Sequence, residues 1–263
     1  MTQADAPIRN PAKEKLQRGE AVLAFNVFEA LRPSVAKIAA QLGIDLLLVE
    51  TEHVSHNPET LTHFLVLARD NGLAPIVTIP TVTRPIVSGL LDAGALGFCL
   101  CHAETPEQVA ELVRWAKYPP LGERALAHAA NADYRITDVA RYCAAANQAT
   151  LLLLKIESRK GIANAGAMLA IEGIDGVVFG PGDLAADMGL HGRWQDPALL
   201  AAMEGVAKLA LARRLAVEPP VGPTDQAEYQ RQRAAGYRIF GPARVTEYDH
   251  LRAGALAALA PFR

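Results

Sequence analysis

Short apolar runs recur along the chain and are separated by longer stretches with a different spacing of apolar residues. Each run is rich in Val, Ile, Leu or Phe and lies close to Gly, Pro or Asp, a pattern typical of short buried β-strands. The predicted strands span residues 21–26, 45–50, 75–79, 97–101, 150–157, 175–180, 214–219 and 237–241.

The stretches between these runs carry apolar residues at helical spacing. One of them, 105–118, opens with Thr105 and Pro106, which are favoured residues at a helix N-cap and first turn. Two others end on glycine, the residue that commonly terminates a helix. The other predicted helices span residues 31–43, 57–72 and 196–214.

Eight strands that alternate with helices predict a (β/α)8 barrel, or TIM barrel, which is typically about 250 residues long. The nearly continuous apolar strands also fit a parallel sheet that is covered on both faces. A doubly wound sheet is the alternative fold, and it is weakened because no G-x-G-x-x-G motif follows a strand. We therefore expect a single barrel domain over residues 1–263, with an N-terminal extension or helix at 1–20 and a C-terminal helix at 244–263.

Composition and charge narrow the class of protein. The 263 residues are 51% hydrophobic and carry a formal net charge of −2, the profile of a globular chain with a sizeable apolar core. The near-zero charge argues against nucleic-acid or membrane-surface binding, and no run approaches the ~18 apolar residues of a membrane helix. A polar start without a signal-peptide core, together with only three cysteines, predicts a cytoplasmic protein.

In a barrel of this type the chemistry lies where the strands end. Lys155 and Glu157 end the fifth predicted strand, and because they are two residues apart their side chains point the same way, into the barrel mouth. Asp183 follows the sixth strand after a Gly-Pro-Gly turn, and His53 follows the second. Two carboxylates on a rigid rim can hold a divalent cation, although Asp183 could instead cap a helix.

Several longer motifs carry a family resemblance. The most specific is GIDGVVFGPGDLAADMGL at 173–190, and KYPPLGER at 117–124 supports it. Further characteristic stretches lie at 10–20, 43–53, 90–97 and 155–158. With these motifs, the sequence resembles the HpcH/HpaI aldolase family over nearly its whole length.

The resemblance implies a metal-dependent, class II aldolase of the pyruvate type on a (β/α)8 barrel. It implies that Glu157 and Asp183 bind the divalent metal, Mg²⁺ or Mn²⁺, with Co²⁺ and Zn²⁺ as further candidates. It also implies that His53 is the acid/base and that Asp92 pairs with this histidine, often from a neighbouring subunit.

The same resemblance implies the substrate contacts and the partners. Backbone groups at Gly182 and Asp183 would hold the substrate carboxylate, and Arg124 matches an arginine common in the family. The expected partners are a small 2-oxo acid and an aldehyde. A homo-oligomer, a hexamer or trimer of dimers, is expected, in which C-terminal helices swap between subunits. The apolar segment 250–262 fits such packing, or else a helix that closes its own barrel.

Three rim positions depart from the family pattern. Thr78 or Ile79 stands where the family has an arginine near the end of strand three, Glu50 replaces an aspartate, and Lys155 replaces a glutamine. We place Thr78 and Lys155 among the substrate-binding residues and Lys155 among the catalytic ones. The hypothesis is that Lys155 supplies the lost arginine charge or pairs with Glu50. Alternatively, Lys155 forms only an ion pair at the rim, or it forms a Schiff base with the substrate, or Arg84 takes the place of the missing arginine.

These observations predict an enzyme that cleaves or forms a C–C bond of a 4-hydroxy-2-oxo acid through a metal-stabilised, pyruvate-type enolate. One alternative is a different C–C lyase or decarboxylase on the same metal site. Another is a non-catalytic descendant that binds a metabolite. The retained Glu157, Asp183, His53 and Asp92 argue against the second alternative.

Overall fold

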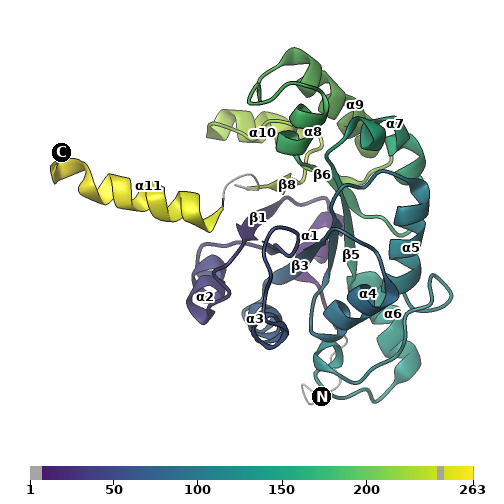
Figure 1. Ribbon diagram of the computed structural model, residues 1–263. Helices are drawn as coiled ribbons and strands as arrows, with labels where there is room; N and C mark the ends of the chain where they lie inside the picture. The colour runs from purple at the N-terminus through teal and green to yellow at the C-terminus, as the bar shows by residue number, and fades with distance from the viewer. Residues whose placement is uncertain (1–7, 242–245, 263) are drawn as a thin grey trace.

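Eight parallel strands surround a central axis in this computed structural model, which describes residues 8–241 and 246–262 (Figure 1). The strands follow the order β7-β6-β5-β4-β3-β2-β1-β8. Their bounds are β1 Val22–Val27, β2 Leu46–Val49, β3 Ala74–Ile79, β4 Gly97–Leu100, β5 Leu151–Ile156, β6 Gly176–Phe179, β7 Ala216–Val217 and β8 Ile239–Phe240.

The strand order confirms the predicted barrel, and the doubly wound alternative is wrong. Neighbours in the sheet are neighbours in the sequence, and β8 returns to pair with β1. Arg238 N donates a hydrogen bond to Val217 O at 3.0 Å, which links the remaining pair, β8 and β7. All eight predicted strands are present, but β7 and β8 have only two regularly paired residues each.

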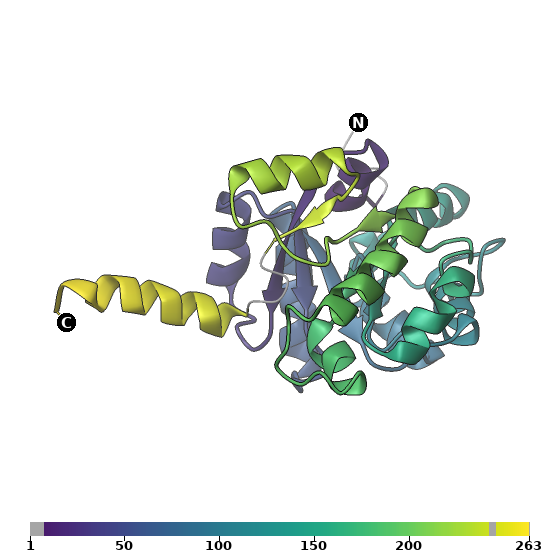
Figure 2. The ribbon, with the colours of Figure 1, turned by 90° about the horizontal axis from the view of Figure 1, so that it is seen from above.

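Helices cover the outside of the strands (Figures 1 and 2). The four helices predicted between strands are found as α2, α3, α5 and α9. The helices are α1 Pro11–Gln17, α2 Pro33–Gln41, α3 Pro58–Asp70, α4 Arg84–Asp92, α5 Pro106–Ala116, α6 Val139–Ala149, α7 Arg159–Met168, α8 Pro181–Asp187, α9 Pro197–Ala212, α10 Gln226–Ala234 and α11 Glu247–Leu259, with short 3-10 turns at Ala130–Ala132 and Ala260–Phe262. None of the helices in the described ranges is long and apolar enough to cross a membrane.

Side chains of β5 alternate between two apolar clusters. Leu152 and Leu154 pack outward with the helices, whereas Leu151 and Leu153 belong to the cluster inside the barrel. Because strand side chains alternate faces, Lys155 continues the inner row toward the carboxyl end of the barrel. The sequence pattern of this strand therefore fixes where its charged end points.

The amino ends of the strands are closed by α1. Asn10 Nδ2 donates hydrogen bonds to Leu96 O and Ala149 O, which precede β4 and β5. Lys13 Nζ donates to Thr150 O at 2.7 Å and pairs with Asp175 at 2.8 Å. The predicted N-terminal helix thus lies across the bottom of the barrel and leaves the opposite end for a site.

The C-terminal helix α11 leaves the barrel (Figures 1 and 2). This helix contains no buried residue. Leu251 within it is 75% exposed, and Phe262 just beyond its end is 83% exposed. The Glu247 carboxylate accepts backbone N–H bonds from Phe28 and its neighbours, which anchors the start of the helix. The alternative of a helix that closes its own barrel is wrong. Of the predicted terminal segments, residues 1–7, 244, 245 and 263 lie outside the described residues.

Candidate active site

A cavity of about 580 Å³ opens at the carboxyl ends of the strands. Its size is that of a small-molecule site. Every strand end from β1 to β7 contributes to its wall, and the loop after α8 adds Trp194. The contributing residues are Asn26, Glu50, Thr78, Cys99, Lys155, Val178 and Glu218, in strand order.

Lys155 and Glu157 form an ion pair at the base of this cavity. Lys155 Nζ lies 2.8 Å from Glu157 Oε1, and the Glu157 side chain is only 1% exposed. The second oxygen of Glu157 accepts a hydrogen bond from His102 N at 2.9 Å. Burial opposes the charge of the ammonium, but the facing Glu157 carboxylate outweighs it, so the pKa of Lys155 lies above its usual value. A Schiff-base lysine needs the opposite shift.

The Glu157 carboxylate fits a divalent cation. Although Lys155 Nζ is close, Glu157 Oε1 accepts no well-formed hydrogen bond from the described residues. A Cβ added at Gly180 would lie 2.0 Å from this oxygen, so the carboxylate occupies space that only glycine leaves open. A buried carboxylate with unused acceptor capacity at a cavity is a suitable ligand for a hard cation.

Asp183, the second predicted ligand, lines the same cavity. It lies in the first turn of α8 and is exposed. The N-cap of this helix is Gly180, with no side-chain capping bond, so the capping alternative for Asp183 does not hold. Gly182 lies beside it in the cavity wall.

The cavity wall is strongly acidic. Four carboxylates line it. Among the described lining residues, Lys155 supplies the one positive charge from a lysine or arginine. Sequence reasoning missed Glu218, which follows β7, is buried, and accepts a hydrogen bond from Phe179 N at 3.1 Å. Its signal was available, because Glu218 ends a predicted strand. A wall of this charge attracts a cation before it can accept an anionic substrate.

A loop after β2 carries His53 to the cavity mouth. Glu50 Oε1 accepts a hydrogen bond from His53 N at 3.1 Å, and Thr78 Oγ1 accepts one from Thr51 N at 3.0 Å. Glu50 and Thr78 thus hold this loop in place. His53 itself is 57% exposed, with Nε2 3.7 Å from the Glu52 carboxylate. The expected pair of Lys155 with Glu50 is not formed, because Lys155 pairs with Glu157.

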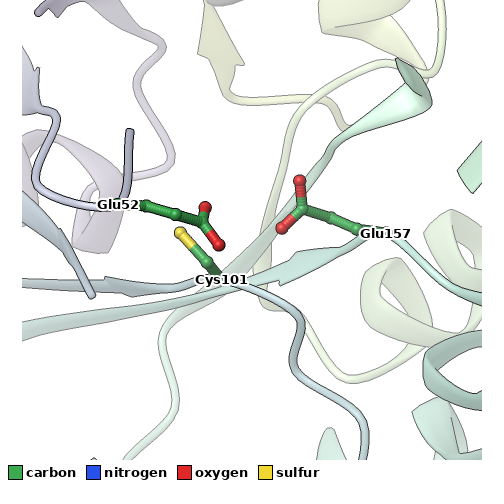
Figure 3. Close-up of side chains that lie close together, drawn as sticks. All are labelled: Glu52, Cys101 and Glu157. Atoms are coloured by element: carbon green, nitrogen blue, oxygen red, sulfur yellow. The ribbon is translucent and has the colours of Figure 1, made fainter. Parts of the chain in front are cut away.

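A second group of potential metal ligands lies beside Glu157. The carboxylates of Glu52 and Glu157 and the Cys101 thiol gather so that one ligand atom of each lies within 4.8 Å of the others (Figure 3). Burial, together with Cys99, raises the pKa of the Cys101 thiol above its usual value. Sequence reasoning missed this group because its three members lie far apart in the chain.

Asp92 and Arg124 lie away from the cavity of their own chain. Asp92 ends α4, toward the amino ends of the strands, and accepts a hydrogen bond from Arg124 Nη2 at 3.0 Å. The Arg124 guanidinium is 2% exposed and lies over the Tyr118 ring, 4.8 Å from its centre. One chain therefore does not bring Asp92 to His53. Arg84 is also elsewhere, over the Trp115 ring at 5.7 Å.

A (β/α)8 barrel with an acidic cavity at the carboxyl ends of its strands has the architecture of a barrel enzyme. The model of the HpcH/HpaI aldolase/citrate lyase family matches residues 27–241. The chain belongs to this family, and it is therefore a carbon–carbon lyase.

Individual relatives agree with this assignment. A hydroxypyruvate/pyruvate aldolase from Roseobacter denitrificans is 32% identical over 193 residues, which cover 73% of this chain and 74% of that protein. A 2-keto-3-deoxy-L-rhamnonate aldolase from Escherichia coli K12 is 32% identical over 185 residues, 70% of this chain and 69% of the relative. The crystal structure of an HpcH/HpaI aldolase from Desulfitobacterium hafniense has a TM-score of 0.87 at 27% identity and covers 95% of both chains.

Proposed function

We propose that the chain is a divalent-metal-dependent aldolase that cleaves or forms the C–C bond of a 4-hydroxy-2-oxo acid. The observation that carries this proposal is the buried Glu157 carboxylate. It lines the cavity, and its Oε1 pairs in charge with Lys155 but accepts no well-formed hydrogen bond from the described residues. The two aldolase relatives, one a hydroxypyruvate/pyruvate aldolase and the other a 2-keto-3-deoxy-L-rhamnonate aldolase, support a 2-oxo acid as the substrate. Glu157 and Asp183 would hold the cation, which supplies polarisation of the substrate ketone and stabilisation of the enolate charge.

The chain's own residues account for the remaining requirements. The Lys155 ammonium supplies a fixed positive charge at the cavity base, where a 2-oxo acid presents its carboxylate and keto oxygens. This charge replaces the family arginine, since Thr78 is buried and holds the β2 loop. Backbone N–H groups at Gly182 and Asp183 remain our proposed contacts for the substrate carboxylate.

Proton transfer is assigned to His53. This imidazole lies at the cavity mouth and can take the proton of the C4 hydroxyl as the C3–C4 bond breaks. The aldehyde then leaves, and the bond's electron pair stays on the three-carbon enolate, which is later protonated. We retain Asp92 of a neighbouring subunit as the partner that orients His53.

A homo-oligomer follows from the same proposal. The α11 helix extends from the barrel with apolar side chains exposed, including Leu251 and Leu256. Its packing on a second copy would cover these side chains. The three free thiols of Cys99, Cys101 and Cys143 suit a reducing, cytoplasmic setting.

A pyruvate-release assay coupled to lactate dehydrogenase tests the proposal. Protein stripped with EDTA is offered a panel of 4-hydroxy-2-oxo acids and then Mg²⁺ or Mn²⁺. We expect release only with metal, and a loss of at least ~10²-fold in Glu157→Gln. Glu107→Gln, on the exposed side of α5, is the matched control and should behave like wild type. No release from any substrate by metal-loaded protein would indicate a different lyase reaction.

A further inference from the structure

Cys101 lies in an arrangement that a packing role does not require. It comes directly after β4, is 1% exposed, and lies beside Glu157 at the end of β5. Glu52 approaches from the loop after β2 with a side chain that is 14% exposed. The ends of β2, β4 and β5 thus direct one sulfur and two carboxylates toward a single point (Figure 3).

The backbone around this point is fixed by hydrogen bonds. Cys101 N donates to Ile79 O at 3.0 Å, so the residue extends the pairing of β4 with β3. His102 then adopts a left-handed conformation, with φ of 43°, and its N–H reaches Glu157 Oε2 at 2.9 Å. The turn after Cys101 therefore orients the Glu157 carboxylate. Such supporting bonds are typical of the surroundings of metal ligands.

Glu157 supplies an independent sign of a metal ligand. Its Oε1 is buried and pairs in charge with Lys155 at 2.8 Å, but it accepts no well-formed hydrogen bond from the described residues. A carboxylate oxygen has two lone pairs, so one ammonium partner leaves acceptor capacity for a cation. We propose that Cys101 is a sulfur ligand of the cation that Glu157 holds, with Glu52 as a further ligand, so that the site prefers Zn²⁺ or Co²⁺ to Mg²⁺.

The chemistry of the donors gives this preference. Thiolate sulfur suits Zn²⁺ and Co²⁺, whereas Mg²⁺ takes oxygen ligands almost exclusively. Ligand atoms around tetrahedral zinc lie roughly 3.3–3.7 Å apart, so the group within 4.8 Å needs only side-chain rotation to close. On binding, the Cys101 S–H bond breaks, a sulfur–metal bond forms, and one proton leaves to solvent.

The buried charges nearly balance. Glu52, Glu157 and the Cys101 thiolate carry three negative charges, and Lys155 lies 2.8 Å from Glu157. A divalent cation together with the Lys155 ammonium offsets these three charges, and the fourth negative charge belongs to Asp183, which is exposed. The inference rests on the proposed function, because both require Glu157 as a ligand, and it adds the two donors that set the metal preference.

Cobalt spectroscopy tests the sulfur ligand directly. Metal-stripped wild type, Cys101→Ser and Cys143→Ser are titrated with Co²⁺, and the near-ultraviolet sulfur-to-cobalt charge-transfer band is recorded. Cys143 lies on α6, outside the cluster, and is the matched control. We expect the band in wild type and Cys143→Ser and its loss in Cys101→Ser. Zn²⁺ affinity should fall at least ~10-fold in Cys101→Ser, with Mn²⁺ affinity nearly unchanged.

A measurement on wild type alone removes any dependence on how the variants fold. Calorimetric Zn²⁺ titration in buffers of different ionisation enthalpy should show about one proton released per ion. Co²⁺ binding without a charge-transfer band, or a band that survives Cys101→Ser, would overturn the sulfur ligand. If Glu157→Gln still abolishes that binding, the proposed function stands and only this inference fails. If Glu157→Gln binds metal like wild type, both fail.

Discussion

A half-buried lysine at one end of the barrel and a buried lysine at the other have different surroundings. At the carboxyl end, Lys155 faces the Glu157 carboxylate, and its pKa is raised. At the amino end, Lys117 donates hydrogen bonds to Asn147 O and Thr150 O at 2.7 and 2.8 Å. Burial lowers the pKa of Lys117 to about 7, and the charge of nearby Lys13 adds to the effect.

The different partners of the two lysines indicate different roles, one in the reaction and one in stability. Lys117 donates its hydrogen bonds to backbone carbonyls, at the end of the barrel that α1 closes. The carboxyl-end lysine lines a cavity and pairs with a carboxylate oxygen that accepts no well-formed hydrogen bond from the described residues. In barrels of this kind, polar groups at the carboxyl ends of strands carry out reactions, and those at the amino ends stabilise the fold.

Removal of the cavity lysine should have the largest effect. We expect Lys155→Ala to lose about 10²–10³ in kcat/KM, because it removes the positive charge that we propose as the substitute for the arginine of the family pattern. Arg84→Ala, whose guanidinium stacks on Trp115 outside the cavity, should change kcat/KM little. Steady-state kinetics of both variants with the same 4-hydroxy-2-oxo acid measure this. Equal and small effects would show that Lys155 only completes a rim ion pair.

A single methyl group at Gly180 should reproduce much of the loss at Glu157. The new Cβ would meet Glu157 Oε1 at 2.0 Å, so the carboxylate must move from its place beside Cys101 and Lys155. We expect about a 10²-fold fall in kcat/KM and weaker metal binding, measured by kinetics and by metal titration. Gly205→Ala, in open space on α9, is the control. Normal metal affinity in Gly180→Ala would place the cation away from Glu157.

The sequence was sufficient to predict the barrel and the direction of its fifth strand. Apolar runs mark buried parallel strands irrespective of tertiary detail, and the two-residue period places Lys155 and Glu157 on one side. The sequence could not predict the partner of Lys155. The Glu50 carboxylate accepts hydrogen bonds from backbone amides of the loop after β2. The conformation of that loop depends in turn on a contact with Thr78 of β3.

The Cys101 cluster shows a second reason for incomplete prediction. Its members are far apart in sequence and meet because β4 pairs with β5 in a register that aligns Leu100 with Leu154. The register between two strands is not visible in the sequence of either strand alone.

Asp92 shows the opposite case, because its motif is plain in the sequence. The described part of one chain pairs Asp92 with Arg124, so the predicted pairing with His53 needs a second copy.

At the amino end, substitution of Asp175 should affect stability and leave activity unchanged. Asp175 pairs with Lys13 at 2.8 Å and accepts a hydrogen bond from Leu152 N, also at 2.8 Å. We expect Asp175→Asn to lower the free energy of unfolding by about 2 kcal/mol, because Lys13 stays buried without its counter-charge. Urea unfolding measures this, and kcat should match wild type. A large fall in kcat at unchanged stability would contradict the division between the two ends.

A pH dependence of the unfolding free energy should originate at Lys117. Its pKa is about 7 when folded and near 10.5 when unfolded, so between these values the unfolded chain binds a proton that the folded chain does not. Unfolding free energy should therefore rise as pH rises from 7 toward 10.5, by up to about 1.4 kcal/mol per pH unit. Lys117→Met cannot take up this proton, and its stability should rise less steeply. Urea unfolding of both proteins between pH 7 and 9 isolates the difference, because Lys13, Asp175 and Arg124 are common to both. Equal slopes of unfolding free energy against pH in the two proteins would mean that Lys117 stays charged in the folded state, as Lys155 does.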